Sequence, residues 1–188
     1  MSSCKKNYTC SPCKPCKSCG VPVSKVIKAI EASRVQVVPS PPVSTSAYGN
    51  FFLDKRVILT YNQPMPWSGI GQTAGITLNP DTVTIEVAQA GSYYIDYYVI
   101  VNFTPTAPPR SDIALMAIFE NGNEINPIQT RYGAVNDEND RNECVPFSGG
   151  TIVFIPAGGT VQLRNIGQNF ETCDFSLLAA SINLIKVS

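Results

Sequence analysis

Cysteine is the residue type with the most evident chemistry in this sequence, and five of the seven cysteines lie among the first nineteen residues. The run T-C-S-P-C-K-P-C-K-S-C-G, which begins at Thr9, places a cysteine at every third position. Thiols in such a run can bind zinc or an iron–sulfur cluster, or they can form disulfides. The five residues are Cys4, Cys10, Cys13, Cys16 and Cys19.

A metal centre fits this cysteine run less well than cross-linking does. Structural zinc sites usually separate their two C-x2-C pairs by a dozen or more residues that fold around the metal. Ferredoxin-type clusters are closer in spacing but need an apolar cover, and here Pro12, Pro15 and several lysines surround the thiols. We therefore expect neither a metal nor another cofactor, and a reduced, flexible tail stays open as an alternative.

The three-residue period suits a polyproline II strand, which has three residues per turn and rises about 3.1 Å per residue. The cysteines would then line one edge, roughly 9 Å apart, and could not easily close on one another. They could pair with the same edge of a second chain. We predict that residues 1–20 form a cross-linking tail, with disulfides between subunits or to a cysteine-rich partner protein.

The amino-acid composition excludes several kinds of function. Histidine is absent, which excludes Ser-His-Asp and Cys-His catalysis and histidine-ligated metals within this chain. Asp96 and Glu86 could act as an acid–base pair, but nothing in the sequence brings them together, so we predict that the protein is not an enzyme. No stretch approaches 18 apolar residues, and no apolar segment accompanies the first cysteines. We therefore expect neither a membrane span nor a secretory signal peptide.

Charge is distributed unevenly along a chain whose formal net charge is zero. Residues 1–42 carry seven cations and one acid, a balance of +6, and the remainder carries seven cations and thirteen acids, a balance of −6. Six charges interleaved with proline and cysteine make a thin patch, so we expect no nucleic-acid partner. The basic segment could instead be attracted to the acidic part of a neighbouring subunit. The acidic run 137–143 could bind calcium, although it contains no D-x-D-x-D-G loop.

Residues 21–45 form a proline-containing segment that we predict to be a connector arm. Ser24 could cap a short helix, and the prolines from Pro39 onward would end any regular structure. Fully extended, the arm reaches on the order of 85 Å, whereas a domain of about 140 residues is roughly 37 Å across. We expect its apolar side chains to dock on a neighbouring subunit, because they would otherwise form an exposed patch. These side chains are Val21, Val23, Val26, Ile27 and Ile30.

From Ser46 onward the pattern becomes all-β, with short apolar segments separated by turn residues. Asn121-Gly122 between two apolar segments is the strongest hairpin signal. Segments at this spacing predict an antiparallel sandwich. The expected strands are Ala47–Leu53, Arg56–Tyr61, Gly75–Leu78, Thr82–Val87, Ser92–Phe103, Asp112–Glu120, Glu124–Gln129, Thr151–Ile155, Thr160–Asn165 and Asp174–Val187.

The strand expected at Ser92–Phe103 is apolar on both faces. One face holds Tyr93 and every second residue after it, and the other holds Tyr94 and Tyr98. An antiparallel strand of this kind must be covered twice. The second cover is either a subunit interface, where tyrosine is enriched, or a thick core within a monomer. The last strand repeats the pattern, and we predict a subunit interface at Tyr94, Tyr98, Ile100, Leu178 and Ile182.

Three segments of residues 46–188 resemble the tumour necrosis factor-like jelly roll. They are A-G-S-Y-Y-I-D-Y from Ala90, G-T-I with the following P-A-G-G-T-V-Q-L from Pro156, and S-I-N-L-I-K-V-S from Ser181. The version they resemble is the complement-globular-head type of Bacillus spore surfaces, as in the collagen-like exosporium glycoproteins. The sequence departs from that family in lacking a Gly-X-Y stalk, in having Gly159 where Asp is common, and in a long insertion at 132–146.

The resemblance implies an antiparallel jelly-roll head at 46–188 that forms homotrimers, here preceded by an extended N-terminal arm. It also implies a location on the spore surface, in the exosporium. We predict a self-assembling subunit of a spore appendage or fibre, in which the arms join trimeric heads head-to-tail and disulfides staple them. An anchoring protein of the exosporium base layer stays open, as does a receptor- or carbohydrate-binding tip that uses Trp67 and Tyr132.

The two remaining cysteines, Cys144 and Cys173, fall in predicted connections, before the strand Thr151–Ile155 and before the last strand. These positions lie at related edges of a jelly roll. We therefore predict one intrachain disulfide between them, which would close a loop of about 30 residues.

Overall fold

The chain divides into two units, residues 1–43 and residues 44–188. The computed structural model describes residues 46–103, 113–136, 144–173 and 178–188, all within the second unit. The cross-linking tail and the connector arm lie outside these residues, so their predicted disulfides and docking contacts stay predictions. The acidic run at 137–143 also lies outside them.

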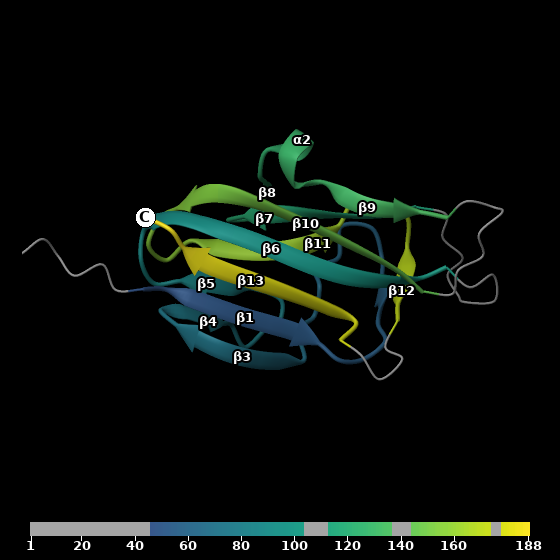
Figure 1. The fold of residues 1–188 in the computed structure, drawn as a ribbon, viewed down its shortest axis with the longest axis horizontal. Coiled ribbons are helices and arrows are strands. Elements are labelled where there is room, and N and C mark those ends of the chain that lie inside the picture. The colour runs from purple at the N-terminus through teal and green to yellow at the C-terminus, as the bar shows by residue number, and fades with distance from the viewer. Residues whose placement is uncertain (1–45, 104–112, 137–143, 174–177) are drawn as a thin grey trace, which may run out of the picture. The chain divides into compact units, whose positions relative to one another are not determined.

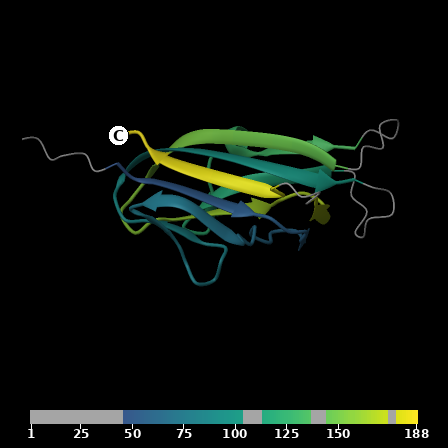
Figure 2. The same cartoon turned by 60° about the horizontal axis from the view of Figure 1, so that its bottom comes forward.

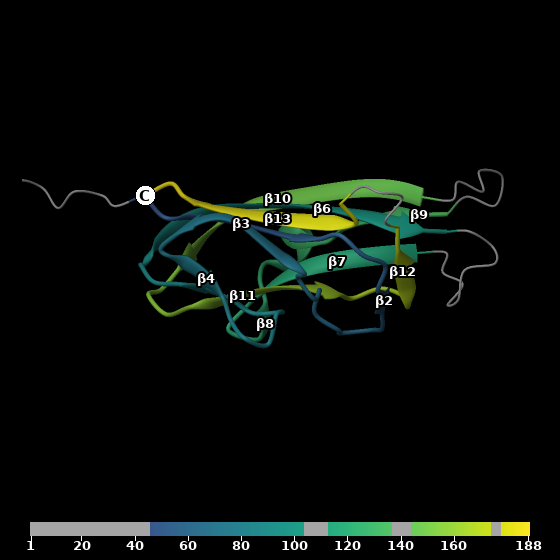
Figure 3. The ribbon, with the colours of Figure 1, turned by 90° about the horizontal axis from the view of Figure 1, so that it is seen from below.

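The described residues form two antiparallel sheets packed face to face, as the edge-on view shows (Figures 1 and 3). Within these residues the large sheet has seven strands in the order β2-β12-β6-β13-β1-β3, with β10 on the other edge of β6. The six-stranded small sheet runs β4-β5-β11-β7-β8, with β9 also paired to β7. The large sheet comprises β1 (Tyr48–Leu53), β2 (Ile58–Leu59), β3 (Gly69–Ala74), β6 (Gly91–Asn102), β10 (Cys144–Ile155), β12 (Phe170–Thr172) and β13 (Ala180–Lys186). The small sheet comprises β4 (Ile76–Leu78), β5 (Ile85–Val87), β7 (Ile113–Glu120), β8 (Asn123–Glu124), β9 (Tyr132–Val135) and β11 (Thr160–Asn165).

The hydrophobic core lies between the two sheets, and β6 alternates between this core and the outer surface as its sequence predicts. Tyr93, Ile95 and Tyr97 are buried. The Tyr97 hydroxyl lies 3.2 Å from the carbonyl oxygens of Met116 and Thr130, to which it can donate, and burial raises the pKa of this phenol. The predicted all-β antiparallel sandwich is confirmed.

Several predicted strands agree with the structure to within a residue or so, and β11 has the predicted bounds. β3, β9 and β12 were not expected, because the G-I-G-Q-T-A sequence of β3, for example, has little apolar alternation. β10 begins at Cys144 rather than Thr151, since it pairs with β6 along its whole length. The last strand, expected from Asp174, begins at Ala180, and residues 174–177 lie outside the described residues.

The strand predicted at Glu124–Gln129 is wrong. β8 ends at Glu124, and the four-residue helix α2 (Pro127–Thr130) follows it. Asn126 adopts a left-handed conformation, with φ of 43°, and Pro127 lacks the N–H that a strand ladder requires. No helix within the described ranges is long and apolar enough to cross a membrane.

The hairpin predicted at Asn121-Gly122 is confirmed as the turn between β7 and β8. Both residues have positive φ, 48° and 81°, as a type I′ turn requires. Asn121 also ties this turn to β11, because its side-chain oxygen accepts a hydrogen bond from the Thr160 amide at 3.0 Å. The turn therefore fixes the register of the small sheet at this edge.

Substituting Gly122 tests the turn. A Cβ at this position would meet no atom within 4 Å, so the cost of a side chain is conformational rather than steric. We expect Gly122→Val to lower the free energy of unfolding by about 1–2 kcal/mol, and Gly122→Asn by less, because Asn tolerates positive φ. Urea unfolding measures both values, and equal losses for the two variants would contradict the turn assignment.

Candidate functional site

The outer face of the large sheet carries a row of exposed apolar side chains that runs across four strands. Ile152 of β10 lies opposite Tyr94 of β6, Tyr94 opposite Ile185 of β13, and Ile185 opposite Tyr48 of β1. Residues paired in this way project from the same face of a sheet. Ile152 is 65% exposed and Tyr94 42% exposed, and Phe154 extends the exposed surface along β10. We call Ile152, Tyr94, Ile185 and Tyr48 the apolar row.

A polar ladder crosses the same face one step further along the strands. Asn50 donates from its amide nitrogen to the side-chain oxygen of Asn183 at 2.7 Å, and Asn183 donates to the carboxylate of Asp96 at 3.0 Å. The three residues lie opposite one another on β1, β13 and β6. Tyr98 follows on the far side of the ladder along β6. The ladder is thus a hydrogen-bonded polar strip set between apolar side chains.

A shallow pocket of about 360 Å³ opens over this ladder, and its lining combines ladder and apolar-row residues. Tyr48 and Ile185 of the apolar row line it, together with Asn50, Asp96 and Asn183 of the ladder. Because apolar surface surrounds hydrogen-bonding groups at fixed positions, this face has the composition of a protein–protein interface core.

The predicted interface residues divide between this face and the interior. Tyr94 and Tyr98 lie on the outer face of β6, and Leu178, which is 45% exposed, precedes β13. Ile100 is 7% exposed, so the head itself already covers it. Whether the three exposed side chains contact another subunit stays a prediction.

The prediction for Ile182 needs correction, because this side chain lies in the core with none of its surface exposed. Ile182 pairs with Tyr97, which also points inward. Residues 177–180 are all apolar, so the sequence does not show which of the following residues face the core. The register with β6 places Ser181, Asn183 and Ile185 on the outer face. Sequence reasoning missed Ile152 and Ile185 for the same reason, since alternation alone does not say which face is buried.

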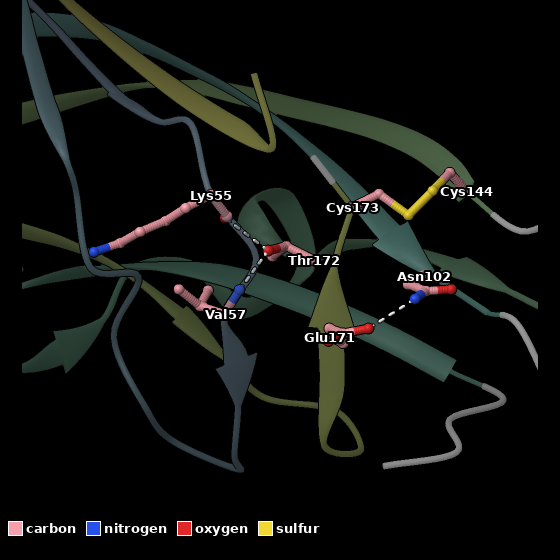
Figure 4. Close-up of a disulfide and its surroundings, with 7 residues drawn as sticks. All are labelled: Lys55, Val57, Asn102, Cys144, Glu171, Thr172 and Cys173. Atoms are coloured by element: carbon pink, nitrogen blue, oxygen red, sulfur yellow. Dashed lines mark hydrogen bonds between the residues drawn. A yellow bond between two sulfur atoms is a disulfide. The ribbon is translucent and has the colours of Figure 1, made fainter. Parts of the chain in front are cut away.

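The predicted disulfide between Cys144 and Cys173 is present, with the two Cα atoms 6.0 Å apart (Figure 4). Cys144 is the first residue of β10 rather than part of a connection, and Cys173 directly follows β12. Both flank the end of β6, where Asn102 pairs with Cys144 on one side and with Glu171 on the other. The amide of Asn102 also donates to the Glu171 carboxylate at 2.7 Å. The disulfide therefore closes the large sheet at this end.

The structure does not bring together the other side chains that the sequence analysis considered as an acid–base pair or as metal ligands. Asp96 projects from the outer face of the large sheet, whereas Glu86 lies on β5 of the small sheet, so the two carboxylates form no acid–base pair. No three cysteine, aspartate or glutamate side chains gather into a metal site within the ranges that the structure describes.

Of the two aromatic residues suggested for a binding tip, Tyr132 is 39% exposed, whereas Trp67 is buried. Trp67 is 2% exposed and belongs to the core. Tyr132 packs its ring edge-on against Tyr97, with the ring centroids 6.3 Å apart. It also covers Gly149 of β10, where any side chain would overlap the Tyr132 ring.

Comparison with known proteins supports the fold. The sequence matches no family model and no curated protein at a significant level. Its structure is similar to the Eiger TNF of S. frugiperda (14% identity, TM-score 0.55), the globular domain of zebrafish complement 1qA protein (11%, 0.54) and murine APRIL (8%, 0.51). Each alignment covers 76% of this chain, and the three cover 92%, 98% and 100% of those chains. The head is therefore a jelly roll of the tumour necrosis factor and complement-globular-head type.

Removing the disulfide tests its contribution to the head. Because it closes a loop between residues 29 apart in sequence, the double variant Cys144→Ser/Cys173→Ser should lose about 3–4 kcal/mol of unfolding free energy. Urea unfolding with and without reductant measures the loss. Reductant should destabilise the wild-type head and leave the double variant unchanged, and an equal response of the two would contradict the assignment.

Proposed function

We propose that this protein is a self-assembling structural subunit of a spore-surface appendage in the exosporium. Its heads form homotrimers through the outer face of the large sheet, and the connector arms join successive trimers head-to-tail. Disulfides of the N-terminal tail staple the joined subunits, either to each other or to a cysteine-rich anchor protein. No enzymatic step is part of this function, and neither nucleic acid nor a membrane takes part.

The apolar row is the observation that carries this proposal. A soluble monomer rarely exposes a contiguous apolar patch that spans four strands, and such patches usually mark interaction sites. Tyrosine and isoleucine side chains gain free energy when a partner removes them from water. The row lies on a sheet whose strands are already paired across it, so the partner covers a face and need not add a strand.

The polar ladder supports a single arrangement of subunits. An interface that is entirely apolar tolerates several orientations, whereas hydrogen-bonding groups at fixed positions within it favour those that satisfy them. Asn50 and Asn183 are already held in one orientation by their own hydrogen bonds. The Asp96 carboxylate at the end of the ladder can accept more hydrogen bonds than the one from Asn183, so a partner that supplies a donor there is favoured over one that does not.

Charge and chain direction support joining through the arm. The described chain enters the head at Ser46, beside the end of β13, where the Lys186 amide donates to the Ala47 carbonyl oxygen at 2.8 Å (Figure 2). Residues 1–42, which comprise the tail and most of the arm and have a charge balance of +6, are attracted to a head with a balance of −6 on another subunit. A head-to-tail contact that does not close into a ring produces an open filament.

The spore-surface location rests on the residues that resemble exosporium heads, such as Ala90–Tyr97 and Ser181–Ser188. A base-layer protein would use the same cysteines for lateral linkage, and a binding tip would form discrete trimers. Electron microscopy of the recombinant protein separates these functions, because fibres support the appendage, flat sheets the base layer, and single trimers the tip.

Charge placed in the apolar row tests the trimer. We expect Tyr94→Glu or Ile185→Glu, made in a head lacking residues 1–42, to raise the dissociation constant by about 100-fold or more, because each interface would bury unpaired carboxylates. Analytical ultracentrifugation measures the mass. Ile128→Glu is the matched control, since Ile128 is 96% exposed on α2 and is not part of the apolar row. Trimers that survive both substitutions would contradict the assigned interface.

Removing the arm tests polymerisation. A chain without residues 1–42 should form folded trimers and no fibres, because the head contains its own core while the connector is gone. Replacing Cys10, Cys13, Cys16 and Cys19 with Ser should leave fibres that dissociate at lower denaturant concentration. Electron microscopy and gels without reductant give both results, and fibres of normal length from the truncated head would overturn the connector role.

A further inference from the structure

A second pocket lies on the opposite side of the sandwich, on the outer face of the small sheet. Its volume is about 370 Å³, within the range of roughly 300–1,000 Å³ that is usual for small-molecule sites. Its lining comes from segments far apart in sequence: the turn after β2, the β7–β8 hairpin, the residue after α2 and the residue after β11. The lining residues are Tyr61, Asn62, Phe119, Glu124, Arg131 and Ile166.

Tyr61 forms an exposed aromatic platform at this pocket, with 70% of its surface open to solvent. Its backbone is held although its ring is exposed. The Tyr61 amide donates to the side chain of Asn169 at 2.9 Å, and the Asn62 amide donates to the Asn165 carbonyl oxygen at 2.7 Å. Asn62 has a φ of 63°, a left-handed conformation that turns the chain directly after Tyr61. The backbone that carries the ring is therefore held in place.

The polar wall of the pocket is also preorganised. The Arg131 guanidinium makes two parallel hydrogen bonds to the Glu124 carboxylate, at 2.6 and 2.8 Å. This pairing holds the pKa of Glu124 below its ordinary value, so the carboxylate stays charged and the guanidinium stays in place. Glu124 lies directly opposite Phe119 in the β7–β8 hairpin.

A second guanidinium stands beside the pocket. Arg164 lies over the Phe119 ring, 4.7 Å from its centroid, and one of its nitrogens donates to the side-chain oxygen of Asn62 at 3.3 Å. Two guanidinium groups and one carboxylate give this region a net positive charge on a head whose overall balance is negative. An acidic ligand is therefore expected to bind here rather than elsewhere on the head.

Several hydrogen-bonding groups at the pocket have no acceptor or donor within the described part of the chain. They are the side-chain amide nitrogen Nδ2 of Asn62, the Nη1 group of Arg131 and the hydroxyl of Tyr61. Donors predominate among them, and the Glu124 carboxylate adds acceptor capacity. An oxygen-rich ligand with both acceptors and hydroxyl groups matches this set.

We propose that the pocket between Tyr61 and Arg131 binds an acidic saccharide, a sugar ring that carries a carboxylate. The apolar face of the sugar ring lies against Tyr61, the carboxylate accepts from the Nη1 group of Arg131, and the hydroxyl groups bond to Asn62 and Glu124. Aromatic rings with a polar edge are suited to ligands that are apolar on one face and polar at their rim. The other lining residues, Phe119 and Ile166, form the apolar floor.

The position of this pocket makes it compatible with the proposed assembly without depending on it. Phe119 alternates with the buried Ile118 on β7, so it projects outward from the small sheet. The apolar row projects outward from the other sheet, in the opposite direction. A trimer formed through the large sheet therefore leaves the saccharide pocket open, and each head of a fibre would present one copy.

Two sugars that differ only in the carboxylate test the proposal on the full chain. Methyl β-D-glucuronide is the acidic probe, and methyl β-D-glucoside is its neutral match. Saturation-transfer NMR, which works well with large assemblies, detects binding, and titration gives the dissociation constant. We expect the glucuronide to bind about tenfold or more tightly than the glucoside, because only the carboxylate makes charge-assisted hydrogen bonds to Arg131.

Three variants assign the contacts. Tyr61→Ala should weaken glucuronide binding by about tenfold or more, whereas Tyr61→Phe, which keeps the ring, should weaken it less. Arg131→Gln should remove the preference for the acidic sugar. Lys55→Gln is the matched control for charge, because Lys55 is an exposed cation outside the pocket, and it should bind as the wild type does.

Different results contradict different parts of the proposal. Absence of saturation transfer from the protein to the glucuronide at millimolar concentration would overturn the proposal, as would binding that Tyr61→Ala and Arg131→Gln leave unchanged. Equal binding of both sugars would overturn the acidic class of ligand. Sedimentation separates this proposal from the trimer. If Tyr94→Glu loses the trimer and still binds the sugar, the two faces act independently.

Discussion

The pairing of β6 along both of its edges is the constraint on which the rest of the head depends. β10 pairs with every residue of this twelve-residue strand, while β13 and β12 share its other edge. A central strand paired in this way has no freedom of register, and a shift by one residue would exchange its core and surface faces. Its core face supplies a line of buried aromatic and β-branched side chains from Tyr93 to Val101. Its outer face supplies Tyr94, Asp96 and Tyr98.

The same constraint creates the candidate interface. Because β10, β13 and β1 are locked in register around β6, side chains from four segments of the sequence form straight rows across the sheet. The apolar row and the polar ladder are two such rows. Neither exists in any single strand, and Asn50 and Asp96 become connected only through Asn183 between them. The disulfide between Cys144 and Cys173 secures the end of this arrangement that lies far from Ser46.

The two outer faces of the sandwich differ in the physics of what they can bind. The large sheet presents apolar side chains on both sides of the hydrogen-bonded polar ladder. This composition suits contact with another protein surface that is also apolar with a few polar groups. The small sheet presents charged side chains that already satisfy one another in part, namely Arg131 with Glu124 and Arg164 with Phe119 and Asn62. Prepositioned charged groups of this kind suit a small, oxygen-rich ligand rather than a large dry interface.

The sequence by itself determined the fold class, the Asn121-Gly122 hairpin and the two-faced character of β6, because period-two alternation and turn residues are local properties. The resemblance to jelly-roll heads led to the pairing of Cys144 with Cys173. Only the tertiary structure decided that Ile182 points inward and Ile185 outward, since both faces of that segment are apolar and the register with β6 makes the choice. The pocket of Tyr61 and Arg131 could also not be predicted from the sequence. Loops that are far apart along the chain form it, and no local sequence pattern indicates that they lie close together. Trp67 illustrates the same limit, since its burial depends on long-range packing that composition does not encode.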